Sequence, residues 1–431
     1  MKSMSGRLPY RLLTAALLLL VLGVSCRKDD YRTGNMDDQP RSSTAGRVED
    51  PVSRRVMLLY SAGYNSLNGY LRDDIDDLSK GDFIPGNHVG DNVLLVFSRQ
   101  PVYAGNYTTP TAPALFRIYK NGKGEAVRDT LDVPGLGPDT LASSAETVHT
   151  VLSYIRSAFP GSTYGVVFSS HGTGWLPEDY YAHPDKYDGD ESGDTGVWSA
   201  PGRRSLGQDL VGKVSHEIEL RDLRDAIPMH LNYLILDVCL MGGVEVAWEL
   251  REKVDTVAFS QTEILAYGFD YRKMARRLLV PGEEGVLGAT KDYFIQYDQD
   301  ATNRAATVSL IDLKQMEPLA EVCADLFEKY RDVVATMNAS PVQHYFRYNR
   351  HWFYDLEDIL VHAGITDAEH ARLTAALDQC ILYKAATPYF LGIAINHYSG
   401  LSMFLPSNGS DFLKGWYREN VSWNDATALV K

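Results

Sequence analysis

The chain has 431 residues, of which 45% are hydrophobic and 11% aromatic, a composition typical of a folded globular protein. Its length predicts one large domain or two ordinary ones. The formal net charge of −14 argues against general nucleic-acid binding, because a protein of that class presents a basic face.

The first 26 residues are typical of an export signal. Three basic residues, Lys2, Arg7 and Arg11, lie before or at the start of the apolar run LLTAALLLLVLGV, which is too short for a transmembrane helix. The sequence around Cys26 resembles a relaxed bacterial lipobox, in which Cys26 becomes the lipidated first residue; a plain signal peptide cut nearby is the alternative. Residues 27–53 are polar and predict a flexible tether. We therefore expect an exported lipoprotein, held by its lipid anchor at the outer membrane or cell surface of a bacterium.

Strands and helices alternate along the chain from residue 54. The predicted elements are a strand at 54–63, a helix at 67–78, a strand at 91–100, a hairpin at 114–133, a helix at 143–160, a strand at 164–171, a helix at 219–227, a strand at 231–240, a helix at 242–254 and a strand at 255–263. This alternation implies a mostly parallel sheet with helices on both faces. Four acids of the first helix, Asp73, Asp74, Asp76 and Asp77, are interpreted as a solvated face.

The remaining segments are less regular. Residues 172–217 are rich in Gly, Asp and Pro and predict a long polar loop. From residue 312 the chain is more helical, and it closes with strand-like segments at 389–406. We interpret 54–311 as an α/β core and 312–431 as a C-terminal extension packed on it.

Two predicted strands bring reactive side chains to one edge of the sheet. One strand ends on His171, followed by Gly172, and the other ends at Cys239. Sites in such sheets form beyond the carboxyl ends of the strands. A thiol protease needs a thiolate, a base and oxyanion donors, and the backbone N–H groups of Gly172 and Cys239 could supply the donors. Taken separately, His171 could be a histidine that bonds its own turn, and Cys239 a small buried hydrophobic residue. Taken together, the two residues favour a catalytic dyad.

Two features near Cys239 refine this interpretation. The following LMGG is expected to open a helix, whose positive dipole end would favour the thiolate. Alternate strand residues share a face, so Asp237 should project beside Cys239. Because a carboxylate opposes thiolate formation, Asp237 is interpreted as binding a cation carried by the substrate; a helix or loop cap is the alternative.

The other cysteines have a simpler interpretation. Removal of Cys26 leaves three cysteines, an odd number that indicates at least one free thiol in an exported protein. Cys323 and Cys380 lie on apolar stripes of predicted helices, so both are interpreted as buried structural residues.

The residues at the strand ends also carry a family resemblance. SSHGTGW, followed 68 residues after its histidine by DVCLMGGVEVAWEL and then by FSQTEILAYGFDY, resembles the clostripain family of cysteine peptidases. The similarity continues through RRSLGQDL, EIELRDLRDAI and GLSMFLP, and includes MLLYSAGYNSLNGYLRDDIDDL, so it covers most of the chain from about residue 54. The resemblance implies a caspase-like three-layer sandwich.

The resemblance also implies roles for individual residues. On the family motif, His171 matches the general base, Cys239 the nucleophile and Gly172 the oxyanion contributor. Asp237 matches the acidic floor of a pocket that selects arginine, or lysine, before the scissile bond. The segment 260–271 should form another wall of that pocket, with two candidate substrate-binding residues, Glu263 and Asp270. Whether GTGW also shapes the pocket stays open.

The long polar loop has two further candidate functions. The family is associated with internal cleavage between the histidine and cysteine strands, and Arg203 and Arg204 are the candidate self-cleavage site; an uncut basic loop is the alternative. The acidic stretch 185–194 lacks the ligand spacing of an EF-hand, so a solvated loop is favoured over a calcium site. No other metal or cofactor is expected.

We therefore expect a secreted cysteine endopeptidase that hydrolyses protein or peptide substrates after Arg or Lys, through a thioester on Cys239. One alternative is a surface lipoprotein that keeps a peptidase-like fold as a binding or adhesion module. Another is a peptidase of asparaginyl or acidic specificity, although Asp237 would repel an acidic substrate.

Overall fold

The computed structural model describes residues 53–88, 90–104, 107–109, 111–180, 183–188, 206–211, 214–346 and 351–431. Asp50–Lys431 is a single compact unit. The predicted signal peptide with Cys26, nearly all of the tether, and the predicted cleavage site at Arg203 and Arg204 lie outside the described residues. Among the helices that are described, none has both the length and the apolar character needed to cross a membrane.

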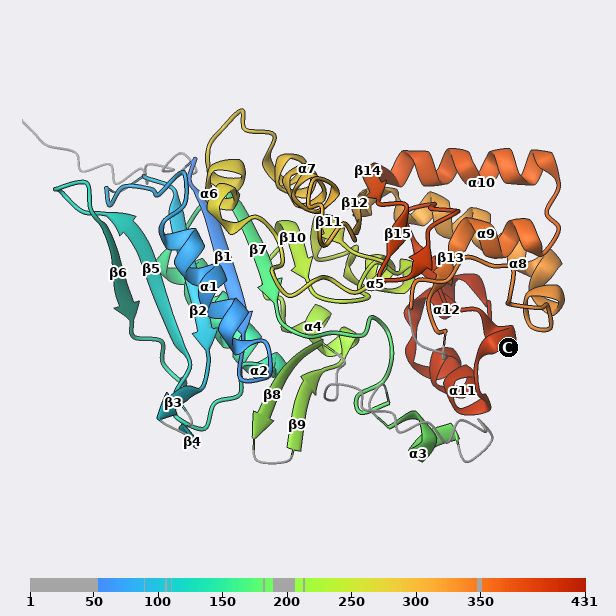
Figure 1. Cartoon of the computed structure of the whole chain (residues 1–431), viewed down its shortest axis with the longest axis horizontal. Coiled ribbons are helices and arrows are strands. Elements are labelled where there is room, and N and C mark those ends of the chain that lie inside the picture. Colours follow the sequence, from blue (N-terminus) through green and yellow to red (C-terminus); the bar gives the residue numbers. More distant parts are fainter. Residues whose placement is uncertain are drawn as a thin grey trace, which may run out of the picture. The chain divides into compact units, whose positions relative to one another are not determined.

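A nine-stranded sheet forms the centre of this unit. Its strands are β1 (Arg55–Ala62), β2 (Val93–Arg99), β5 (Ala114–Lys120), β6 (Ala126–Leu131), β7 (Thr163–Ser169), β10 (Leu231–Asp237), β11 (Val254–Phe259), β12 (Thr307–Asp312) and β14 (Ile381–Ala386). They lie in the order β14-β12-β11-β10-β7-β1-β2-β5-β6 (Figure 1). The central run from β11 to β2 is parallel, and the pairs at both edges are antiparallel. The predicted mostly parallel sheet is confirmed.

Alternate residues of the central strands face two separate hydrophobic cores. On β1, Val56, Leu58 and Tyr60 belong to one core, whereas Met57 and Leu59 belong to the other. The first core includes residues of α2 (Ala145–Ala158), α4 (Leu220–Ala226) and α5 (Val244–Leu250), and the second includes residues of α1 (Asn68–Ser79), α6 (Tyr271–Leu279) and α7 (Gly285–Asp298). Helices therefore cover both faces of the sheet, as the three-layer prediction requires.

The segment after β12 is mostly helical. It contains η2 (Leu313–Gln315), α8 (Met316–Val334), β13 (Tyr354–Asp355), α9 (Leu356–His362), α10 (Asp367–Cys380), β15 (Tyr389–Phe390), β16 (Ile393–Ala394), β17 (Ser402–Met403), η3 (Pro406–Asn408), α11 (Asp411–Asn420) and α12 (Ser422–Thr427). The boundary expected at residue 312 falls on the last residue of β12, and β14 from beyond it joins the central sheet. Core and extension therefore share one sheet.

Trp175 answers the question left by the GTGW motif. Its ring lies 4.9 Å from that of Phe404 and 5.0 Å from that of Tyr417, measured between centroids, and its side chain is buried. Both partners belong to the C-terminal extension. Trp175 thus anchors the extension and does not line the cavity described below.

Several short elements were not predicted. They are β3 (Val102–Ala104), β4 (Tyr107–Thr109), α3 (Pro184–Asp188), β8 (Leu206–Val211) and β9 (Val214–Ile218). Apart from its last residue, Ile218, the β8–β9 hairpin lies inside the segment 172–217 that was predicted to be a loop. Buried Leu206 and Ile218 tie this hairpin to the first core, so the loop prediction is wrong for these residues.

Candidate active site

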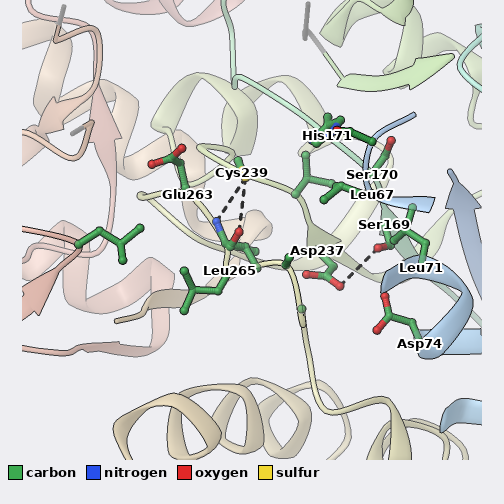
Figure 2. Close-up of a pocket in the computed structure, with 16 residues that line it drawn as sticks. Leu67, Leu71, Asp74, Ser169, Ser170, His171, Asp237, Cys239, Glu263 and Leu265 are labelled. Carbon is green, nitrogen blue, oxygen red and sulfur yellow. Dashed lines mark hydrogen bonds between the residues drawn. The ribbon is translucent and has the colours of Figure 1, made fainter. Parts of the chain in front are cut away.

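The strands β7 and β10 end at the same level of the sheet. Their last residues, Ser169 and Asp237, are partners in the parallel register. His171 and Cys239 each follow two residues later, so the register places both just beyond the same edge. Both line a cavity of about 320 Å³ (Figure 2). The structure therefore brings together the predicted base and the predicted nucleophile, which are far apart in the sequence.

A backbone amide hydrogen-bonds to the half-buried Cys239 thiol. The Ile264 N–H donates to Sγ at 3.4 Å, and Sγ lies 3.7 Å from the Ile264 carbonyl oxygen (Figure 2). The N–H and the carbonyl of one residue thus fix the position of the sulfur. The expected helix dipole does not act here: α5 begins at Val244, five residues after Cys239, and a dipole's effect is confined to the terminal turn. Leu240, at φ 61°, turns the chain away instead.

Two neighbours fix the segment that follows Cys239. Gly242 donates its N–H to the Ser260 carbonyl at 2.7 Å and accepts from the Ser402 N–H at 2.9 Å. A Cβ at position 242 would lie 2.6 Å from the Gln261 backbone nitrogen, so only glycine permits this approach. The nucleophile loop is thus held between the predicted pocket wall and the C-terminal strand β17.

The His171 imidazole is buried beside a serine that sequence reasoning missed. Its Nε2 lies 2.9 Å from the Ser66 Oγ, and its side chain is 2% exposed. Ser66 follows β1, and β1 is the neighbour of β7 in the sheet. Only the strand order reveals that these two loops meet, and the sequence does not specify that order.

Gly172 directly follows His171 but is not itself among the residues that line the cavity. It pairs with Leu206 of β8 in an antiparallel bridge, and the Gly207 N–H donates to the His171 carbonyl at 2.8 Å. In such a ladder, neighbouring residues direct their N–H groups to opposite sides. The Gly172 N–H therefore points away from β8.

Asp237 lies buried at the floor of the cavity. Its Oδ2 accepts from the Tyr271 hydroxyl at 2.6 Å, the Ser169 hydroxyl at 3.4 Å and the Phe269 N–H at 3.5 Å. Burial raises the pKa of the carboxyl above its ordinary value, although these three donors oppose the rise. Gly268, at φ 59°, allows the backbone to pass, because a Cβ there would lie 2.3 Å from Oδ2.

Asp74 is a second acid in the same cavity, and its assignment to a solvated face is wrong. It lies on the buried side of α1 and is 7% exposed. Burial raises the pKa of its carboxyl, and the charge of Asp237 raises it further. A helical period places Asp74 one turn from buried Leu71 and Leu78, a signal that the run of four acids obscured.

Part of the segment predicted to form a second wall of the pocket lines the cavity, but Asp270 does not. Glu263 lines the cavity, together with residues 264–266 and 268 of the same segment. Asp270 does not: it is the N-cap of α6, accepts from the Lys273 N–H at 3.3 Å and pairs with the Lys273 ammonium at 2.7 Å. The structure therefore does not bring Asp270 to the substrate cavity.

The rim of the cavity carries an exposed apolar side chain. Leu391 is 47% exposed and forms, with Gly392, the two-residue turn between β15 and β16. Their φ angles are 41° and 97°, and a left-handed conformation is unfavourable for leucine. The turn places the Leu391 side chain in the lining of the cavity.

The cavity is strongly acidic. Its described lining holds three carboxylates, Asp74, Asp237 and Glu263, and neither lysine nor arginine. In the described ranges, this cavity included, no three His, Cys, Asp or Glu side chains are placed to hold a metal ion. Most of the candidate calcium stretch 185–194 lies outside those ranges, so that alternative stays a prediction. A cation is the ligand that this cavity suits.

Comparison with known proteins gives a consistent result. The profile of the clostripain family matches residues 59–429. An inactive zymogen C11 protease from Parabacteroides distasonis is similar with a TM-score of 0.69 at 25% identity, over 86% of this chain and 97% of that one. A secreted C11 cysteine protease from Bacteroides thetaiotaomicron has a TM-score of 0.69 at 22% identity, over 87% and 99%. No curated protein matches. These likenesses confirm the predicted fold.

Proposed function

Because the chain belongs to the clostripain family of cysteine peptidases, we propose that it cleaves peptide bonds after basic residues, preferring arginine. Family membership favours an enzyme over an adhesion module. The observation that carries the specificity is the buried Asp237, which forms the floor of the cavity beside Cys239 with no lysine or arginine in the described lining. A basic side chain would supply the missing cation.

In the proposed mechanism, Cys239 and His171 exchange one proton over the cycle. The Cys239 sulfur attacks the substrate carbonyl carbon while His171 accepts the thiol proton. His171 then protonates the amine as the C–N bond breaks, which leaves a thioester. A water molecule, deprotonated by His171, hydrolyses the thioester and restores the thiol. With Nε2 directed at Ser66, proton transfer would pass through Nδ1.

Two backbone amides are the proposed oxyanion donors. The Gly172 N–H faces away from β8, and the Cys239 N–H follows the end of β10. One donor of this kind is worth roughly 10²- to 10³-fold in rate. Neither donor depends on a side chain, so substitutions that keep the backbone path should preserve this stabilisation.

The proposal includes export and lipid anchoring. The N-terminal basic and apolar segments before Cys26 support a lipoprotein at the outer membrane or cell surface. Its substrates would be proteins or peptides rather than nucleic acid. Cleavage at Arg203 or Arg204 would make it a two-chain enzyme; mass analysis of the active protein finding one intact chain would contradict that.

Hydrolysis of matched peptides tests the function. Fluorogenic peptides ending in arginine, lysine or citrulline, which is an uncharged analogue of arginine, are compared with wild type and Cys239→Ala. We expect wild type to prefer the two basic peptides and Cys239→Ala to lose at least about 10³-fold in kcat. Undiminished activity of the variant contradicts the nucleophile, and a preference for citrulline contradicts the specificity.

A further inference from the structure

We infer that Asp74 is a second substrate-binding carboxylate, which together with Asp237 binds the positive end of the basic side chain. The inference rests on the proposed function and adds to it a residue from another layer of the fold. Asp74 comes from α1, whereas Asp237 ends the central strand β10. Figure 2 shows the two carboxylates next to each other at the floor of the cavity.

Asp74 is buried without a compensating charge. Its side chain is 7% exposed, and within the described part of the chain no hydrogen bond or ion pair reaches its carboxylate. The outward acids of the same helix differ, because Asp76 and Asp77 pair with arginines at 2.7 Å and 2.6 Å. A buried carboxylate with no partner is unfavourable for folding. Such a group points to a ligand that arrives from outside.

Asp237 presents its second oxygen to the same ligand. The three hydrogen bonds that fix Asp237 all go to Oδ2. Oδ1 therefore remains for a cation in the cavity. The protein therefore fixes the orientation of the Asp237 carboxylate. Both carboxylates can still bind a ligand.

The surroundings of this pair supply hydroxyls and acids, not cations. The groups that face it are Ser169 on β7, His171 after β7, Cys239 after β10, Glu263 in the pocket wall, Tyr271 on α6, and Tyr293 and Tyr297 on α7, whereas Asp73 and Asp77, on the outer side of α1, act on it only through their charge. Burial raises the pKa of both carboxyls, and Asp237 raises that of Asp74 further. Before substrate binds, these raised pKa values favour a proton on the pair, which an arriving cation would displace.

Two carboxylates favour a guanidinium over an ammonium. A guanidinium is planar and carries donors on several edges, so it can bridge Asp74 and Asp237 at once. An ammonium is a compact point charge that gains less from the second acid. Asp74 should consequently contribute more to arginine than to lysine.

The first test compares Asp74→Asn with Asp73→Asn, a matched loss of one charge on the exposed face of the same helix. For Asp74→Asn, kcat/KM should fall about 10- to 100-fold on the arginine peptide, less on lysine and not on citrulline. Asp73→Asn should change none of the three. An equal loss on all peptides, or no loss on arginine, overturns the inference. If wild type itself prefers citrulline, the proposed function has failed instead.

The second test does not depend on the folding of Asp74→Asn. Benzamidine, a mimic of the arginine side chain, is titrated calorimetrically into Cys239→Ala near neutral pH, in buffers of different ionisation enthalpy. Binding to the protonated pair should release close to one proton, so the observed heat should follow the buffer. Binding with no buffer dependence overturns the inference.

Discussion

Two buried acidic sites in this protein are built in opposite ways. At the first, Oδ2 of Asp209 on β8 meets Nη1 of Arg99 at 2.7 Å and accepts from the Ala142 N–H at 2.5 Å, with both charged side chains almost fully buried. At the second, Asp237 and Asp74 have no cation within the described residues. A buried carboxylate that folds with its own cation is part of the architecture. One that folds without a cation and lines a cavity is available to a ligand.

The largest expected effect is the loss of stability when the ion pair of the first site is broken. Asp209→Ala leaves the Arg99 guanidinium buried without its counter-ion, so the free energy of unfolding should fall by about 3–5 kcal/mol. Urea denaturation measures the change. The double variant Arg99→Met/Asp209→Leu is the control, and it should recover most of the loss. A loss below about 1 kcal/mol for Asp209→Ala contradicts a structural role for the pair.

The next effect separates function from stability at the second site. Asp237→Asn should lower kcat/KM on arginine peptides by roughly 10²- to 10³-fold, because the substrate cation loses its buried partner. The free energy of unfolding at neutral pH should not fall, because the variant removes an uncompensated charge. Asp76→Asn, a surface acid of α1, serves as the control and should change neither quantity. A large loss of stability with unchanged selectivity would show that Asp237, like Asp209, supports the fold and does not bind the substrate.

A third acid sharpens the comparison through pH. Glu245 is 1% exposed and accepts from the Phe404 N–H at 2.8 Å and the Tyr417 hydroxyl at 2.9 Å. Burial raises its pKa from 4.5 to about 7. Between these values the folded protein keeps a proton that the unfolded chain loses, so stability falls as pH rises from 4.5 to 7.

Glu245→Gln should remove this decrease in stability between pH 4.5 and pH 7. At pH 8 the variant should be more stable than wild type by about 3 kcal/mol, and at pH 4 the two should agree. Thermal unfolding at both values gives the comparison. Glu252→Gln, an exposed acid nearby in the chain, should leave the pH dependence unchanged. A destabilised Glu245→Gln at pH 8 would show that the charged form is needed.

The smallest expected effect concerns the rim of the cavity. Leu391→Asn places a residue that tolerates left-handed φ in the two-residue turn, so stability should rise by about 0.5–1 kcal/mol. Peptide turnover should fall a few-fold, because the exposed apolar contact at the mouth is lost. Denaturation and kcat/KM on the arginine peptide measure the two changes. Higher stability with full activity would show that the strain serves no purpose at the site.

The sequence predicts those residues of the site whose positions depend on one strand and its end. Strand periodicity places Asp237 beside Cys239, and the family resemblance pairs both with His171. Asp74 and Ser66 were missed because they belong to the connection after β1, and only the order of strands brings that connection beside β7. Sequence proximity to the wall made Asp270 a candidate, but helix α6 begins directly after it and uses its side chain as a cap.

The hydrogen bond between Gly242 and Ser402 has a consequence for timing. A ribosome makes the nucleophile loop long before β17, whose Ser402 N–H donates to the Gly242 carbonyl of that loop. A nascent chain therefore carries its cysteine for much of synthesis and export without a completed site. The C-terminal extension therefore supplies part of the structure around the nucleophile and does not only pack on the core.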